Sequence, residues 1–154
     1  MLEWLLRTDK ETSLLIMRLA LGLVMFPHGA QKLLGWFGGQ GFSATMHSFT
    51  EVQHIPAVFA FLAIAAESLG ALGLVLGLLT RVAAFGIGFE MLVAALLVHV
   101  NYGFFMNWFG TQGGEGFEYH ILAIGLALAL VLKGGGRLSL DRQIYVKSVG
   151  GVGN

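Results

Sequence analysis

Three ionisable residues, Arg18, Glu67 and Glu90, stand within long apolar runs of this sequence. Ionisable side chains in such runs are costly to bury, and they usually face the protein interior and pair with one another. One arginine facing two glutamates leaves one negative charge unbalanced, and burial together with like-charge proximity favours the neutral form of one carboxyl group. With helices that alternate in direction and rise ~1.5 Å per residue, the three residues fall in one layer. We therefore expect a buried charge cluster of these three residues, which either fixes the helix register or shares a proton.

A second set of polar residues stands near the ends of the same apolar runs. Arg18, Leu21, Met25, His28 and Lys32 follow the three- and four-residue spacing that places side chains on one face of a helix. Pro27 cannot donate a backbone hydrogen bond, so we expect a kink just before His28 and a small polar cavity beside it. The predicted ligand pocket consists of His28, Lys32, His99, Glu118, Phe104 and Trp108.

Three histidines at similar depth, His28, His99 and His120, suggest a metal site as an alternative. The direction of the side chains argues against it. On ideal helices His99 is about half a turn away from Glu90, and His120 is likewise opposed to Glu118. We therefore expect no metal ion here, although both histidines lie at helix ends, where the backbone can depart from ideal geometry.

The amino-acid composition indicates whether these ionisable residues lie in a soluble protein or in a membrane protein. The chain has 154 residues, of which 56% are hydrophobic and 12% are charged, and its mean hydropathy is +0.76. Soluble domains usually carry about twice this share of charged residues. A soluble protein of this size could not bury so much apolar surface, so the composition predicts a membrane protein.

Four apolar runs approach the ~20 residues of helix that cross a hydrocarbon core. The basic residues outside these runs all fall before the first run, between the second and third, or after the fourth, and the positive-inside rule places these segments in the cytoplasm. The sequence therefore predicts an all-α membrane protein, a four-transmembrane-helix bundle with both termini inside. The expected spans are Thr12–Leu34, Pro56–Leu79, Val82–Val100 and Phe117–Leu132, and the basic residues are Arg7, Lys10, Arg81, Lys133, Arg137, Arg142 and Lys147.

Three further features of the composition bear on packing and chemistry: the glycines, the aromatic residues and the absence of cysteine. Glycines on the second and third runs allow close helix approach, mostly within the bundle and alternatively between copies of the chain. The two outer connections are rich in glycine and aromatic residues, which form an interfacial belt or cover the cavity beside His28. Because the chain has no cysteine, any redox chemistry requires a bound cofactor or a partner.

Four stretches in order resemble the DoxX family of membrane proteins. They are "RLALGLVMFPHGAQKLLGWFGG", "AAESLGALGLVLGLLTRVAA", "HVNYGFFMNWFG" and "FEYHILAIGLALALVLKGGGRLSLD", and the likeness runs from about Leu14 to Asp141. Pro27 and His120 depart from the family pattern. The family positions fall on Arg18, His28, Gly29, Lys32, Glu67, Gly77–Arg81, His99, Gly103–Phe105, Glu118 and Ser139–Asp141.

The resemblance implies a four-helix protein of the prokaryotic cytoplasmic (inner) membrane that serves as a membrane subunit of a quinone-linked oxidoreductase. A quinone would sit in an apolar slot near the outer leaflet, with His28 and Lys32 as donors to a carbonyl and Glu118 as proton partner. Two alternatives remain: a non-catalytic anchor or assembly partner of an oxidoreductase complex, and a small oligomeric transporter or channel. Whether the chain is itself an enzyme stays open.

The expected organisation is one transmembrane domain with two short flanking segments. Residues 1–11 form a cytoplasmic N-terminal segment, residues 12–141 the four-helix domain, and residues 142–154 a cytoplasmic tail. We expect the lipid bilayer, an oxidoreductase subunit and further copies of the chain as partners, and no nucleic acid. The only cofactor implied is a non-covalently bound quinone.

Overall fold

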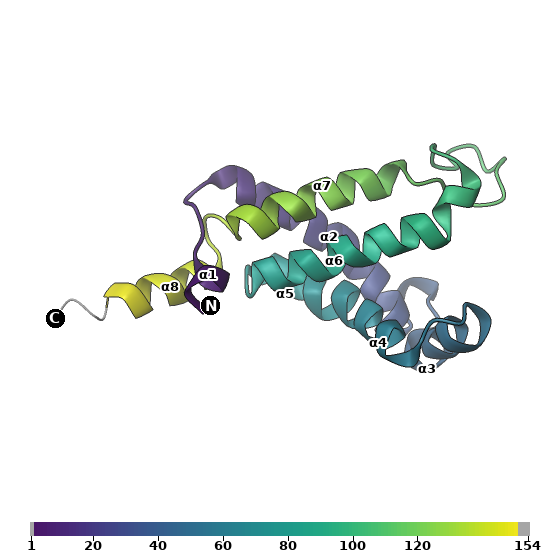
Figure 1. Ribbon diagram of the computed structural model, residues 1–154, viewed down its shortest axis with the longest axis horizontal. Coiled ribbons are helices and arrows are strands. Elements are labelled where there is room, and N and C mark those ends of the chain that lie inside the picture. The colour runs from purple at the N-terminus through teal and green to yellow at the C-terminus, as the bar shows by residue number, and fades with distance from the viewer. Residues whose placement is uncertain (1, 151–154) are drawn as a thin grey trace.

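The computed structural model describes residues 2–150 and is all-helical over this range. The long helical segments run side by side along the longest axis of the molecule, and the first and last described helices lie at the same end (Figure 1). The elements are α1 (Leu2–Leu6), α2 (Thr12–Leu34), η1 (Trp36–Gly38), α3 (Gly41–His47), η2 (Ser48–Val52), α4 (Ala57–Ala65), η3 (Ala66–Gly70), α5 (Ala71–Leu76), α6 (Thr80–Leu97), η4 (His99–Tyr102), α7 (Glu118–Lys133) and α8 (Leu140–Gly150).

Three helices in the described part of the chain are long and apolar enough to cross a membrane: Thr12–Leu34, Ala57–Leu76 and Thr80–Leu97. The fourth expected span forms α7, which packs against α6 and α2 but has only 16 residues. The prediction of an all-helical membrane protein is therefore confirmed, and the first three spans match their predicted bounds to within a few residues.

The helices bury small and branched side chains between them and leave large apolar ones outside. Leu21, Leu74, Ile87 and Leu130 are among the buried residues at the centre of the bundle. Large apolar side chains on the outer surface of every long segment stay exposed, as a bilayer requires and water would penalise. Examples are Ile16, Leu23, Phe59, Phe61, Phe85, Phe89, Leu96, Leu122, Leu128 and Leu132.

Several of the predicted small-residue contacts occur inside the bundle. A Cβ atom added at Gly86 would lie 3.4 Å from the Ala66 side chain, and one at Gly88 would lie 2.9 Å from that of Ala127. These glycines let α6 approach η3 and α7 closely, which is how membrane helices gain packing energy. Their positions explain packing within one copy of the chain.

Arg18 holds together the end of the bundle where both termini lie, here called the terminal end. Its side chain is 2% exposed, and it donates hydrogen bonds to backbone carbonyl oxygens of α5 and of the segment between α7 and α8. The acceptors are Leu74 (2.9 Å), Val75 (2.5 Å), Gly135 (2.9 Å) and Leu138 (3.0 Å). The last carbonyls of a helix lack partners within the helix, so a buried guanidinium at the end of α5 satisfies them.

The expected cluster of Arg18 with Glu67 and Glu90 was wrong, because in the described part of the chain Arg18 forms no ion pair with either glutamate. Its carboxylate neighbour is Asp141, at the start of α8. The reason is the direction of the side chain. In a helix the Cα–Cβ bond tilts toward the N-terminus, so Arg18 reaches toward the terminal end of the bundle and away from the middle.

Asp141 caps the start of α6 at the same end. One of its carboxylate oxygens accepts a hydrogen bond from the backbone N–H of Leu79 (2.7 Å) and the other from that of Thr80 (2.8 Å). The helix before this turn ends at Leu76, and the next residue, Gly77, has a φ of 67°, which favours glycine. The tight turn, Arg18 and Asp141 together fix how α5, α6 and α8 meet.

The second long segment contains a backbone irregularity that the sequence did not predict. Helix α2 stays helical from Thr12 through Pro27 to Leu34, whereas Ala66–Gly70 between α4 and α5 forms a π-helical segment. Such segments are rare, and they are frequent at functional sites. This one carries Glu67 and packs directly against Gly29 of α2.

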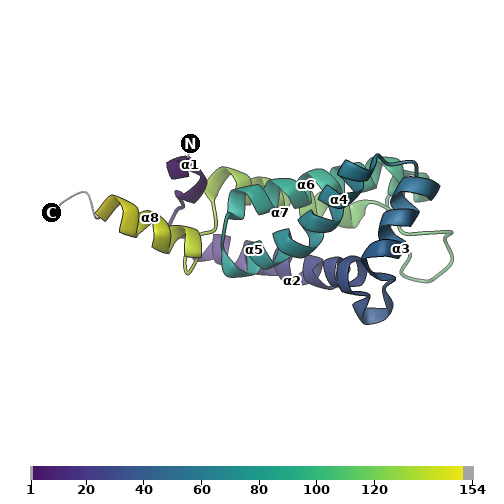
Figure 2. The ribbon, with the colours of Figure 1, turned by 90° about the horizontal axis from the view of Figure 1, so that it is seen from below.

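Helix α3 lies across the end of the bundle opposite to the termini (Figure 2). With η2 it forms most of the first outer connection, and the second outer connection is the loop before α7. We call this end the cavity end, because the cavity described below is found there.

Candidate functional site

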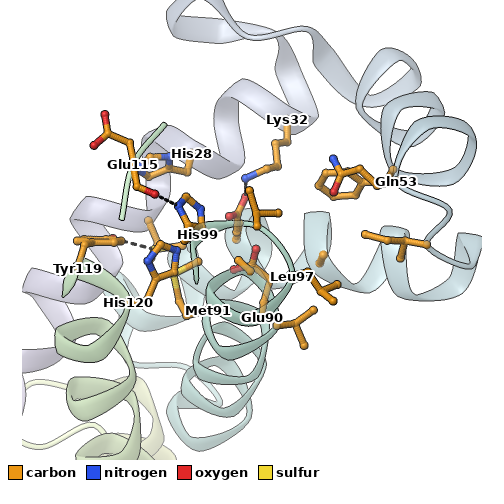
Figure 3. A pocket seen from close by; sticks show the side chains of 18 of the residues that line it. His28, Lys32, Gln53, Glu90, Met91, Leu97, His99, Glu115, Tyr119 and His120 are labelled. Carbon is orange, nitrogen blue, oxygen red and sulfur yellow. Dashed lines mark hydrogen bonds and ion pairs between the residues drawn. The ribbon is translucent and has the colours of Figure 1, made fainter. Parts of the chain in front are cut away.

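A cavity of about 440 Å³ is lined by residues of α2, α4, η3, α6, the start of α7 and both outer connections. Figure 3 shows polar side chains from α2, α6, η4 and α7 directed into it. Its walls combine methionine and aliphatic side chains with a limited number of polar groups, which is the usual make-up of a small-molecule site. The lining residues are Met25, His28, Lys32, Phe49, Gln53, Ile55, Ala63, Glu67, Glu90, Met91, Val93, Ala94, Leu97, Val98, His99, Met106, Glu115, Tyr119 and His120.

Lys32 and Glu67 form an ion pair across the cavity. The Lys32 ammonium donates a hydrogen bond to Glu67 Oε2, and the two side chains are 26% and 3% exposed. Lys32 lies near the C-terminal end of α2, and its long side chain points back along the helix. The π-helical segment turns Glu67 toward it, so the pair joins the first and second long segments.

Glu90 of α6 lies beside this pair. Its carboxyl group is within hydrogen-bonding reach of that of Glu67 and experiences the charge of Lys32. Its Oε2 atom is buried and has no hydrogen-bond donor among residues 2–150. The cavity thus contains an ion pair of Lys32 with Glu67 and a second carboxyl group, that of Glu90, beside it.

Imidazole groups occupy the opposite side of the cavity. The rings of His99 and His120 pack with their centroids 4.1 Å apart at 42°, and His120 is 5% exposed. His99 Nδ1 is 2.7 Å from the carbonyl oxygen of Glu115, so this nitrogen carries the proton and Nε2 is left for another partner. In the described chain the buried Nδ1 of His120 has no partner.

Tyr119 lines the cavity between the pair His99 and His120 and helix α2. Its hydroxyl group donates to the Met25 sulfur at 3.3 Å, a contact that links α7 to α2. Both residues line the cavity. The arrangement offers a ligand one charged polar wall, one imidazole wall and soft apolar surfaces between them.

Comparison with protein-family models identifies the chain. The model of the DoxX family matches residues 13–100, more than half of the 154 residues. This protein belongs to the DoxX family. No curated protein and no solved structure matched the chain in the corresponding searches. The matched region covers α2 to α6 and therefore contains His28, Lys32, Glu67, Glu90 and His99 of the cavity.

Three of the six residues predicted for the ligand pocket line the cavity of this DoxX protein: His28, Lys32 and His99. The other three, Glu118, Phe104 and Trp108, are not among the described lining residues, and the predicted set is corrected accordingly. Glu118 Oε1 instead accepts hydrogen bonds from Met106 N (2.9 Å) and Trp108 Nε1 (3.2 Å), which orders the second outer connection. That connection holds most of its aromatic rings away from the cavity, and the Trp108 side chain is 78% exposed.

Glu67 and Glu90 were expected to form one charge cluster with Arg18, which would either fix the helix register or share a proton. Glu67 and Glu90 line the cavity at the cavity end of this DoxX protein, and the nearby cation is Lys32 in place of Arg18. Backbone rise alone places the three residues in one layer, but the long side chains of Arg18 and Lys32 both extend toward the N-terminus of α2 and so reach other partners. The three- and four-residue spacing of Met25, His28 and Lys32 was the signal that located the correct wall.

The alternative of a three-histidine metal site has no geometric support. His28, His99 and His120 all line the cavity, yet no group of three or more His, Cys, Asp or Glu within residues 2–150 is arranged to hold a metal ion. His99 and His120 do meet, although ideal helices would direct them apart, because His99 stands in the 3₁₀ segment beyond the end of α6.

Proposed function

We propose that this DoxX-family chain is a multi-pass protein of the prokaryotic cytoplasmic membrane with four spans and both termini inside. The support is the charge distribution. At the terminal end Arg81 donates to the carbonyl oxygen of Arg7 (3.0 Å), and Lys133 pairs with Asp9 (3.4 Å). Basic residues gathered at one end of a bundle mark the cytoplasmic side. The cavity end is then the outer end, and α7 is the fourth span, held against α6.

We propose further that the protein is the membrane subunit of a quinone-linked oxidoreductase, and that the outer cavity binds the quinone. The observation that carries this proposal is the cavity itself: an ammonium group and imidazole groups face apolar walls within an intramembrane bundle. Its volume of about 440 Å³ lies within the range of small-molecule sites, ~300–1,000 Å³. An aromatic ring with two carbonyl groups fits this combination of donors and apolar walls.

The residues of the chain have distinct parts in this proposal. His28 and Lys32 on α2 would donate hydrogen bonds to a ring carbonyl, and Lys32 would add positive charge where negative charge develops. Met25, Met91 and Ile55 line the cavity and would exclude water from the ring. A bound quinone would supply two-electron, two-proton redox chemistry, and since the chain has no cysteine, its electrons would come from a partner subunit.

Quinone content of the gently purified protein tests this proposal. We expect close to one quinone per chain in the native protein and about tenfold less retained by His28→Ala, since loss of one hydrogen bond of ~1.4 kcal/mol changes affinity tenfold. His47→Ala is the matched control, because His47 is exposed on α3 and is not among the lining residues. Quinone no richer than in the surrounding lipid, in all three proteins, would favour a non-catalytic anchor instead.

A further inference from the structure

We propose that Glu67 and Glu90 hold one proton between them, and that this carboxyl pair is the proton site of the cavity. The inference rests on the proposed quinone function for its purpose, because a quinone site must exchange protons with the ligand. The proton itself is inferred from the contacts of the pair, and it is measurable in protein from which quinone has been removed.

The first argument is the balance of charge. The Glu67 carboxylate is paired with Lys32, and it is 3% exposed. Glu90 approaches the same two groups from α6. With both carboxyl groups ionised, the bundle would contain one uncompensated negative charge, which is costly in an interior with little water. One proton shared by the two groups removes that charge.

The second argument is hydrogen bonding. Buried polar atoms are nearly always paired, yet Glu90 Oε2 has no donor among the described residues. The group within reach is the Glu67 carboxyl, which accepts hydrogen bonds but donates one only when it is protonated. A proton on either glutamate converts two facing acceptors into a donor and an acceptor.

The other ionisable groups that face the cavity do not replace this proton. They come from α2, η4, the second outer connection and α7: His28, His99, Glu115, Tyr119 and His120. The ion-pair contacts of residues 2–150 include no histidine, since Lys32 with Glu67 and Lys133 with Asp9 are the pairs found. The His99 Nδ1 proton is donated to the Glu115 carbonyl, and the Tyr119 proton is donated to Met25.

Infrared spectroscopy of quinone-free protein at neutral pH tests the proposal. We expect a carbonyl band equivalent to one buried carboxylic acid per chain, which shifts in D₂O. Both Glu67→Gln and Glu90→Gln should abolish it, because the remaining carboxylate is then balanced by Lys32. Glu118→Gln is the matched control and should keep the band, since Glu118 binds the outer connection and is not among the lining residues.

Two results would overturn the inference: no acid band in the native protein, or a band that persists in Glu67→Gln and disappears only in Glu90→Gln. If either glutamine variant fails to fold, a carbodiimide that labels protonated carboxyl groups in apolar sites replaces it. On the native chain we expect label on Glu67 or Glu90, and label only elsewhere would contradict the proposal. If the infrared acid band is present but the purified protein contains no bound quinone, the proton site stands and the quinone proposal is rejected. If quinone is bound but the acid band is absent, the quinone proposal stands and the proton site is rejected.

Discussion

Replacement of Arg18 by alanine should destabilise the protein by about 3–5 kcal/mol, the largest loss expected for any single exposed or buried charge in the bundle. The guanidinium donates to carbonyl oxygens of Leu74, Val75, Gly135 and Leu138. Each buried carbonyl left without a donor costs about 1–3 kcal/mol, and part of that cost is recovered as water or the backbone adjusts. Arg18→Lys should recover only part of the loss, since one ammonium group cannot match the planar set of guanidinium donors.

Denaturant unfolding of the detergent-solubilised protein measures this effect. Arg137→Ala is the matched control, because Arg137 lies at the same end with its side chain exposed, and only its backbone takes part in the contacts described. Equal stability of Arg18→Ala and Arg137→Ala would show that the terminal end is not held together by these hydrogen bonds.

Replacement of Gly29 by valine should cost about 3 kcal/mol or more and also reduce ligand binding. A Cβ atom at this position would overlap the backbone carbonyl of Glu67 and the Cα atom of Ser68. Backbone cannot move aside as a flexible side chain can, so α2 and the π-helical segment must separate. That separation would pull Lys32 away from Glu67, and therefore folding and the cavity should be affected together.

Thermal unfolding and quinone content of the same preparation test this prediction. Gly125→Val is the matched control, since a Cβ atom at Gly125 in α7 would contact nothing within 4 Å. We expect the control to retain the stability of the native protein within about 1 kcal/mol. Normal stability of Gly29→Val would mean that the close contact between α2 and the π-helical segment is not required.

The positions of the helices could be predicted because the bilayer limits the backbone conformations that an apolar segment can adopt. Long apolar runs must form helices, and the first run was predicted with the bounds found, Thr12–Leu34. The last run was harder to predict: the expected span Phe117–Leu132 forms a helix from Glu118 to Lys133, which is shorter than the three candidate spans found in the described residues. Hydropathy predicts that this short run is helical. That α7 belongs to the bundle follows only from its packing against α6, which hydropathy does not describe.

The pairing of charges could not be predicted from depth alone. Arg18, Glu67 and Glu90 were placed in one layer by counting backbone rise, whereas the structure joins Glu67 to Lys32 and leaves Arg18 with carbonyl groups. Side chains of arginine and lysine extend several ångströms along the helix, which is enough to exchange partners. The π-helical segment Ala66–Gly70 also changes the direction of the Glu67 side chain, and no residue pattern in the sequence predicts this segment.

The residues of the outer connections that line the cavity could not be predicted from the sequence. Their aromatic residues were expected to form an interfacial belt or to cover the cavity, and the exposed rings of Phe105, Trp108 and Phe109 do not cover it. The residues of the first connection that do line the cavity, Phe49, Gln53 and Ile55, lie in and after the π-helical segment η2. Loop geometry of this kind follows from long-range contacts, which a single sequence does not display.

The central claim is that the cavity at the outer end of the bundle binds a quinone, and photoaffinity labelling tests it most directly. A quinone analogue carrying a photoreactive group on its ring is added to the native protein, illuminated, and located by mass spectrometry of the resulting peptides. The account predicts label on the α2 segment around His28 and the α6 segment around Glu90, removed by excess unmodified quinone. Label confined to the exposed aromatic residues around Trp108, or unaffected by competition, would contradict it.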